Sequence, residues 1–89
     1  MIKVTEDAKK ILEMRLAQHT TKTDVGLRLV PKESGKIGLA TDKVRKGDQV
    51  IKKDDRTLLL VGKELSSILD GMTLLIEDTE DGTKRMAFR

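Results

Sequence analysis

The stretch ESGKIG, residues 33 to 38, comes nearest to a known chemical motif in this chain. Its glycines flank a lysine just after an apolar run, which is typical of a loop that grips a phosphate. A P-loop requires G-x-x-x-x-G-K-[ST], and aligning Gly35 and Lys36 with it places Val30 at the first glycine and Ile37 at the hydroxyl position. Neither position has the residue that the motif requires. The segment that follows is expected to be a strand, so no helix N-terminus is available to hold a phosphate. We interpret the stretch as a glycine-relaxed connection between two strands.

Few other side chains form a catalytic set. The 89 residues contain no cysteine, which excludes disulfides, thiolate metal sites and cysteine nucleophiles among them. His19 is the only histidine, so it is the only imidazole available as a base for Ser34, Ser66 or Ser67. It falls in a polar loop, where a solvated side chain is the commoner case. We therefore expect no enzymatic activity, and no role for His19 as a metal ligand.

Two acidic turns offer the carboxylates that a hard cation prefers. They are Asp54-Asp55 and the set Asp78, Glu80 and Asp81. Neither has the spacing of a calcium-binding loop, and carboxylates in charged turns are usually solvated. No metal site and no cofactor site is predicted from the sequence.

Positive charge is concentrated in the middle of the chain, although the net charge is only +3 at pH 7. Residues 28 to 53 hold eight basic and three acidic residues, whereas residues 54 to 82 hold two basic and eight acidic ones. A candidate interaction surface is the basic set Lys32, Lys36, Lys43, Arg45 and Lys46. Spread lysines are most often a solvated face, and with Phe88 as the only aromatic the chain lacks the stacking platforms of single-strand binders. Nucleic acid is therefore a disfavoured partner.

The elements that position these residues begin with an amphipathic helix from about Glu6 to Gln18. Thr5 is a suitable N-cap, because its hydroxyl accepts free N–H groups of the first turn, and acidic residues at positions 6 and 7 suit the helix dipole. Apolar residues at helical spacing form one face: Ala8, Ile11, Leu12 and Leu16.

Alternating apolar residues predict strands over residues 25 to 31 and 37 to 42. Residues 49 to 53 and 57 to 61 are predicted to pair as a hairpin around Asp54-Asp55. The run LLLV in the last of these predicts the most buried strand. A short helix over residues 63 to 69 is expected to present Leu65, Ile68 and Leu69 to the core and to end at Asp70-Gly71. A second hairpin follows, with strands over 72 to 79 and 83 to 89 around the turn at residues 80 to 82.

This order, β-α-β-β-β-β-α-β-β, predicts an α+β fold with small mixed or antiparallel sheets, one N-terminal helix and one short helix. The length fits one domain, residues 1 to 89, with a mainly aliphatic core. No apolar run approaches the roughly 20 residues that span a membrane. The opening MIKVTEDAKK has no apolar signal core, so we expect a cytoplasmic protein and no membrane partner.

Three segments together resemble the HesB-like, A-type iron–sulfur cluster carrier family. MIKVTEDAKKILEMRL resembles its opening strand, threonine cap and helix; GLRLVPKESGKIGLATD resembles its central strand, glycine-rich turn and strand; and KGDQVIKKDDRTLLLVGKELSSILDGMTLLIED resembles the remainder. The likeness covers almost all 89 residues. It implies a HesB-like fold and, because members of the family form dimers or tetramers, self-association.

The resemblance breaks at the family's ligand cysteines. The family's turn has a G-C-S-G pattern, which falls on residues 35 to 38 and places Lys36 where the family has a cysteine. A Cys-Gly-Cys tail follows in the family, and this chain reaches Arg89 about where that tail would begin. The resemblance thus implies a cluster-ligand turn whose ligand has been replaced.

Three functions follow from these observations. The first is a cysteine-free relative of the carriers that serves as a non-catalytic binding or adaptor protein for a protein partner, with no cluster of its own. The second is iron or iron–sulfur cluster handling with ligands from a partner or from a small thiol. The third is weak anion or nucleic-acid binding through the basic region 32 to 46.

Overall fold

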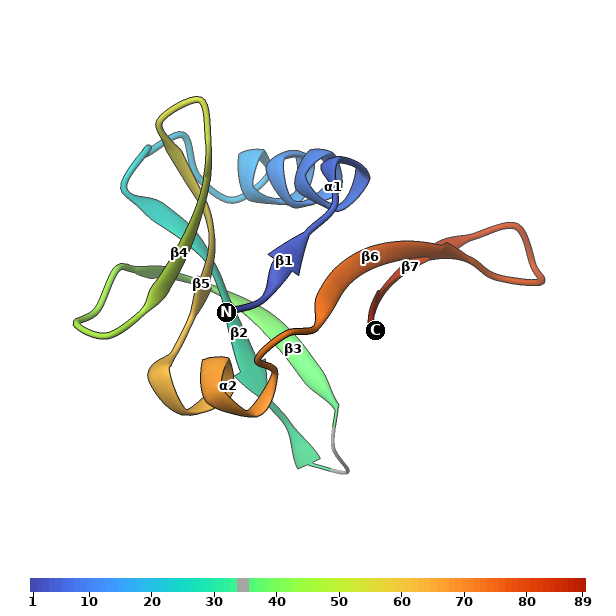
Figure 1. Cartoon of the computed structure of the whole chain (residues 1–89). Helices are drawn as coiled ribbons and strands as arrows, with labels where there is room; N and C mark the ends of the chain where they lie inside the picture. The colour runs from blue at the N-terminus through green and yellow to red at the C-terminus, as the bar shows by residue number, and fades with distance from the viewer. Residues whose placement is uncertain (34–35) are drawn as a thin grey trace.

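A computed structural model describes residues 1–33 and 36–89, and its elements follow the predicted order (Figure 1). The first four are β1 (Lys3–Val4), α1 (Glu6–Ala17), β2 (Val25–Pro31) and β3 (Ile37–Lys43). The next five are β4 (Gln49–Lys53), β5 (Arg56–Val61), α2 (Lys63–Ile68), β6 (Thr73–Asp78) and β7 (Lys84–Phe88).

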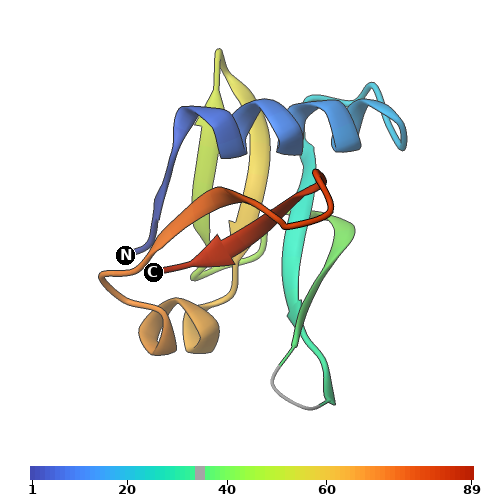
Figure 2. The same cartoon turned by 90° about the vertical axis from the view of Figure 1, so that its right-hand side faces the viewer.

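The strands form two mixed sheets. One has the order β1-β6-β7 and the other β3-β2-β5-β4. The pairs β1–β6 and β2–β5 are parallel, and the other neighbouring strands are antiparallel. Helix α1 contacts β2 and β5 of one sheet and β6 of the other, so it lies across both (Figures 1 and 2). The predicted α+β class is confirmed.

Helix α1 begins where its cap was predicted. The Thr5 hydroxyl accepts a hydrogen bond from the Ala8 N–H at 3.2 Å, and the first turn is acidic. Leu12 and Leu16 are fully buried on the face that meets the sheets. The helix ends at Ala17, one residue earlier than predicted, because residue 18 forms the C-cap.

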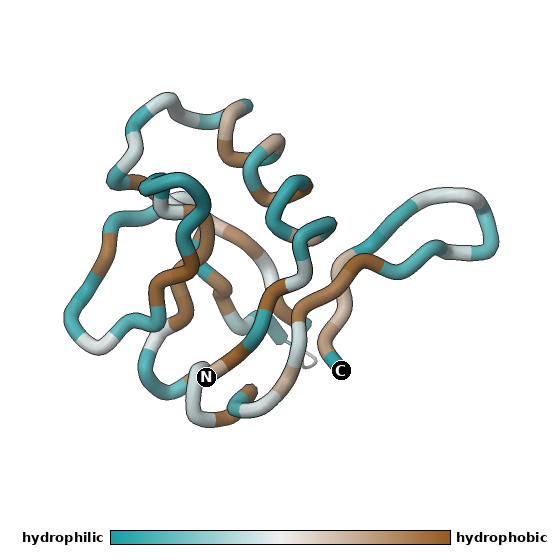
Figure 3. Tube along the Cα trace, turned by 45° about the horizontal axis from the view of Figure 1, so that its top comes forward, coloured by the Kyte–Doolittle hydropathy of each residue, from teal (hydrophilic) through white to brown (hydrophobic). Residues whose placement is uncertain are grey.

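Strand β5 is the centre of the core. Four successive residues, Leu58 to Val61, have no exposed surface, which confirms the prediction that this strand is the most buried. Figure 3 shows apolar residues along the strands and hydrophilic residues in the projecting β6–β7 turn. The turn that leads into it has positive φ at Asp54 (50°) and Asp55 (66°), as a tight two-residue hairpin requires. Aspartate tolerates this conformation better than most residues.

The short helix α2 buries a narrower stripe than the sequence predicts. Leu69 is buried and Leu65 packs against the core, but Ile68 is 75% exposed, so its predicted core position is wrong. Positions 65 and 69 share one helical face, whereas neighbouring residues point about 100° apart. A helix of six residues has too few turns to bury a second stripe.

The Gln49 side chain joins the start of the chain to β4. Its Oε1 accepts from the Ile2 N–H at 3.0 Å, and its Nε2 donates to the Ile2 carbonyl at 2.9 Å. The Ser66 hydroxyl donates to the same Oε1 at 3.3 Å. One glutamine side chain thus bonds to the backbone as a neighbouring strand would, and it connects the two sheets.

Candidate functional site

Lys36 lies at the end of the β2–β3 connection with its side chain exposed. Its carbonyl accepts from the Lys32 N–H at 2.7 Å, which extends the hairpin by one pair beyond Pro31 and Ile37. The chain continues as strand β3, so no helix N-terminus follows the lysine, as expected for a turn that is not a P-loop. Ser34 and Gly35 fall outside the described residues.

Gly38 of β3 lies beneath the side chain of Lys32. A Cβ added there would collide with Cε of Lys32, because the aliphatic part of the lysine side chain crosses over the glycine. Because the Lys32 side chain is exposed and flexible, a substitution at Gly38 requires only that this side chain move aside.

The five basic residues proposed as one interaction surface do not form a single cluster. The β2–β3 register pairs Pro31 with Ile37 at one end and Val25 with Lys43 at the other. Six residues of strand separate these ends, about 20 Å. Of the five basic residues, the first end carries Lys32 and Lys36, and the second carries Lys43, Arg45 and Lys46.

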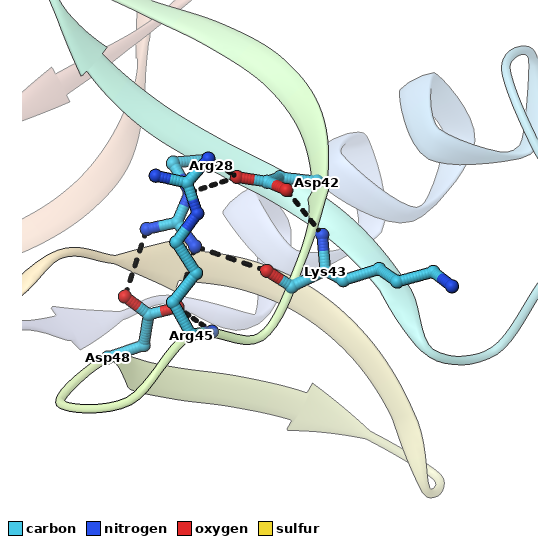
Figure 4. A network of polar contacts seen from close by, with 5 residues as sticks. All are labelled: Arg28, Asp42, Lys43, Arg45 and Asp48. Carbon is cyan, nitrogen blue, oxygen red and sulfur yellow. Dashed lines mark hydrogen bonds and ion pairs between the residues drawn. The ribbon is translucent and has the colours of Figure 1, made fainter.

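Arg28 forms a charged network on the outer face of the same hairpin (Figure 4). Its Nε donates to Asp42 at 2.7 Å, and its two terminal nitrogens donate to the two oxygens of Asp48 at 2.9 and 2.6 Å. Asp48 also accepts from the Arg45 N–H at 2.7 Å, and Arg28 donates to the Lys43 carbonyl at 3.2 Å. The bidentate pair ties the β3–β4 turn to β2.

The Arg28–Asp48 pair at the centre of the network is shielded from solvent. The Arg28 side chain is 12% exposed and that of Asp48 only 3%. The hydrogen bonds that Arg28 donates to Asp48 raise the pKa of Arg28, and the hydrogen bonds from Arg28 lower the pKa of both Asp48 and Asp42. Because each charge already has its partner, we assign the network a structural role. The sequence signal that could have found it is a lone arginine on the face of β2 opposite the apolar side chains.

These shifts predict an acid-sensitive fold. A lowered aspartate pKa contributes stability that is fully present above the unfolded value, 3.8, and is lost as the pH falls through the lower folded value. Urea unfolding from pH 7 to about pH 2 should therefore show the stability difference between wild type and Asp48→Asn shrinking with acid. Asp55→Asn, which removes an exposed turn carboxylate, is the control and should keep the wild-type pH slope. An unchanged difference for Asp48→Asn would contradict the assignment.

A cleft of about 580 Å³ lies on the inner face of the β2–β3 hairpin. The sequence did not indicate this cleft. Strands β2, β3, β6 and β7 and helix α1 all contribute to its lining. A second hollow of about 550 Å³ continues along β3 as far as Thr41 and shares Arg15 and Leu39 with the first. His19 lines this second part, at the far end of α1 from the predicted cap.

Comparison with known proteins bears on the fold alone. No family model matches the sequence, and no curated protein sequence matches it. Among the solved structures that match is IscA with the [2Fe-2S] cluster, at 20% identity and a TM-score of 0.59 over 100% of this chain and 84% of that one. Another is Escherichia coli SufA, involved in biosynthesis of iron–sulfur clusters, at 21% identity and a TM-score of 0.68 over 99% of this chain and 83% of that one. The chain has the fold of IscA and SufA. The HesB-like, A-type carrier fold expected from the sequence is therefore confirmed.

An iron–sulfur cluster does not fit the donors that this IscA-like chain offers. Such clusters are held by cysteine thiolates, and the 89 residues contain none. The side chain at the position that resembles the family's ligand turn is Lys36, whose ammonium group donates hydrogen bonds and has no free acceptor. Within residues 1–33 and 36–89, no three acidic or histidine side chains gather where they could hold a metal ion.

The remaining candidate residues are engaged in local structure or exposed. Asp81 accepts from the hydroxyls of Thr79 and Thr83, and these bonds lower its pKa to about 2. The Ser67 hydroxyl donates to the Lys63 carbonyl at 3.2 Å. Asp54 and Asp55 lie exposed in the β4–β5 turn, and Asp78 and Glu80 lie exposed at the β6–β7 turn. In the part of the chain that the structure describes, no helix is long and apolar enough to cross a membrane.

Proposed function

We propose that this chain is a cysteine-free relative of the iron–sulfur cluster carriers that acts as a non-catalytic binding or adaptor protein and holds no cluster of its own. The observation that carries the proposal is Lys36. By the sequence resemblance it stands where the carriers have a cysteine, in a chain whose fold matches IscA and SufA over 99 to 100% of its length. A framework kept while its metal donor is replaced by a cation supports a role in which the surface, rather than a cluster, matters.

The state of the polar side chains supports a non-catalytic role. The hydroxyls of Ser66 and Ser67 both donate to groups that hold the fold together. The side chains of Arg28 and Asp48 form hydrogen bonds with each other, so their charges are not available to bind a substrate. As part of the same proposal, we expect the partner to be a protein and the location to be the cytoplasm.

The first test is anaerobic incubation of the purified protein with iron and sulfide, followed by desalting, metal analysis and a visible spectrum. We expect a folded protein with iron at background and no cluster absorbance, because clusters need thiolates. Cluster absorbance in the protein alone would overturn the proposal. Absorbance that appears only after addition of a small thiol would favour the alternative in which a thiol or a partner supplies the ligands.

Single-cysteine variants sharpen this test of Lys36. Lys36→Cys restores one thiolate to the turn, and Lys46→Cys places one thiolate at another exposed lysine. In the presence of a small thiol, we expect Lys36→Cys to retain more iron than Lys46→Cys. Equal retention by the two variants would mean that position 36 has no geometry suited to a ligand, and the correspondence with the family's cysteine would be lost.

A further inference from the structure

Two open sheet edges face the same cleft. The order β3-β2-β5-β4 leaves β3 at an edge of one sheet, and the order β1-β6-β7 leaves β7 at an edge of the other. Residues 37 to 39 of β3 and 84 to 88 of β7 line the cleft together. An edge strand presents unpaired N–H and C=O groups, which are a template for another strand.

The pairing of β3 indicates which of its backbone groups are open. In an antiparallel pair, hydrogen-bonded and non-hydrogen-bonded residues alternate. The Lys32 N–H donates to the Lys36 carbonyl, and Pro31, which has no N–H, pairs with Ile37. By alternation, the backbone groups of Ile37, Leu39 and Thr41 point away from β2, toward the open edge.

The same argument applies to β7. Thr73 and Arg89 exchange N–H to carbonyl bonds of 2.7 and 3.0 Å, so they are a hydrogen-bonded pair of the β6–β7 ladder. The residues between such pairs, among them Met86 and Phe88, therefore direct their backbone groups to the outer edge of β7. An extended chain in the cleft would find backbone partners on either side.

The lining combines an apolar floor with cations. The apolar side chains come from β2, β3 and β7: Leu29, Ile37, Leu39, Met86 and Phe88. Arg15, Lys84 and Arg85 supply positive charge, and Arg85 lies 3.7 Å from Glu77. Among the residues that the structure describes, no carboxylate forms an ion pair with Arg15 or Lys84. Two cations beside the cleft are thus available to an acidic ligand.

We propose that the cleft binds an extended, acidic segment of a partner protein, which adds as a strand to the open edge of β3. Its apolar side chains pack on the floor of the cleft, and its carboxylates reach Arg15 and Lys84. Strand β3 has seven residues, or about 23 Å at the usual rise, so a segment of five to seven residues fills the edge. Recognition of this kind takes affinity from main-chain hydrogen bonds and specificity from the side-chain pockets.

A separate partner fits better than a second copy of this chain. Glu77 of β6 is already paired within its own sheet, with Arg85 and Arg89. The acidic β6–β7 turn is a closed loop in which Asp81 is held by Thr79 and Thr83, so it has no free strand to add. This inference deepens the proposed adaptor role and rests on it, since it names the class of partner.

The probe is a synthetic nine-residue peptide in which glutamate alternates with valine or leucine, with both ends blocked. Titration into the isotope-labelled protein should shift the backbone amide signals of Ile37, Leu39 and Thr41 most strongly. A peptide of the same pattern with lysine in place of glutamate is the control for charge, and it should bind more weakly. No shifts at millimolar peptide, or equal binding of the two peptides, would overturn the proposal.

Two sets of variants separate the backbone contact from the charge contact. Thr41→Pro removes an outward N–H without breaking the β2–β3 ladder and should abolish the shifts at the edge. The double variant Arg15→Glu/Lys84→Glu should weaken binding by roughly fivefold or more, because two exposed charge pairs are lost. Lys46→Glu/Lys63→Glu makes the same change in net charge at two exposed lysines that do not line the cleft, and it should bind as the wild type does.

Two further outcomes are decisive. Wild-type affinity for the peptide in Arg15→Glu/Lys84→Glu would overturn the proposal. So would amide signals of residues 37 to 41 that shift with protein concentration when no peptide is present, because a second copy of the chain would then occupy the edge. Metal analysis of the same samples keeps the two claims apart. A protein that holds no iron and does not bind the peptide would refute only the proposal that the cleft binds a strand. A protein that holds a cluster and binds the peptide would refute only the proposal that the chain has no cluster.

Discussion

Replacement of Arg28 by methionine is expected to lower the free energy of unfolding by about 3 kcal/mol. The methionine keeps much of the side-chain volume but leaves Asp48, whose side chain is 3% exposed, as an unpaired buried carboxylate. Removal of one partner of a buried pair costs more than the pair contributes, because the remaining charge stays desolvated. Urea or guanidinium unfolding at pH 7 measures the loss.

Arg45→Met is the matched control for this prediction. Its side chain is 69% exposed and pairs with Asp42 at the surface, so the expected loss is below about 1 kcal/mol. The double variant Arg28→Met/Asp48→Asn should recover part of the loss, since asparagine is uncharged and its oxygen can still accept from the Arg45 N–H. Equal losses in the Arg28 and Arg45 variants would show that the network contributes no more than a surface ion pair.

The parts of the fold that were predictable from the sequence are those that neighbouring residues decide. The Thr5 cap, the alternation over residues 25 to 31 and the turn at Asp54-Asp55 each depend on a few adjacent residues, and each is confirmed. The order of elements follows from these local preferences. Its agreement with the IscA and SufA fold explains why a likeness assembled from loose motifs identified that fold although the identity is only 20 to 21%.

The parts that were missed depend on contacts between distant residues. Arg28 reaches Asp42 and Asp48, which are 14 and 20 residues away, and nothing local to Arg28 indicates those partners. The cleft requires β3 and β7 to face each other although they belong to different sheets. The basic residues were grouped because they are close in sequence, whereas the hairpin places them at its two ends.

The two faces of the β2–β3 hairpin therefore have different roles. On the outer face, charges satisfy one another and fix the β3–β4 turn. On the inner face, Arg15 and Lys84 remain available beside apolar side chains and an open strand edge. Under the proposed function, this inner surface recognises a partner although the chain has no cysteine.

Leu60→Ala is expected to cost about 3 kcal/mol, even though Leu60 lies outside the main core cluster. Leu60 has no exposed surface, and it pairs with Arg28 on β2 and with Val50 on β4, which places it on the outer face of the sheet. On that face its neighbour on β2 is Arg28 of the charged network. Chemical unfolding measures the cost, and Val44→Ala, at a residue 50% exposed, should change stability by less than about 0.5 kcal/mol.

The double variant Arg28→Met/Leu60→Ala tests whether the network shields this leucine. If the methylene groups of Arg28 cover Leu60, removal of the leucine side chain alters the packing of Arg28 itself. The two losses should then differ from additivity by about 0.5 kcal/mol or more. Strict additivity would mean that the ion pairs and the buried leucine stabilise the sheet independently. Coupling would show instead that one arginine both ties the turn to β2 and closes the outer face of the core.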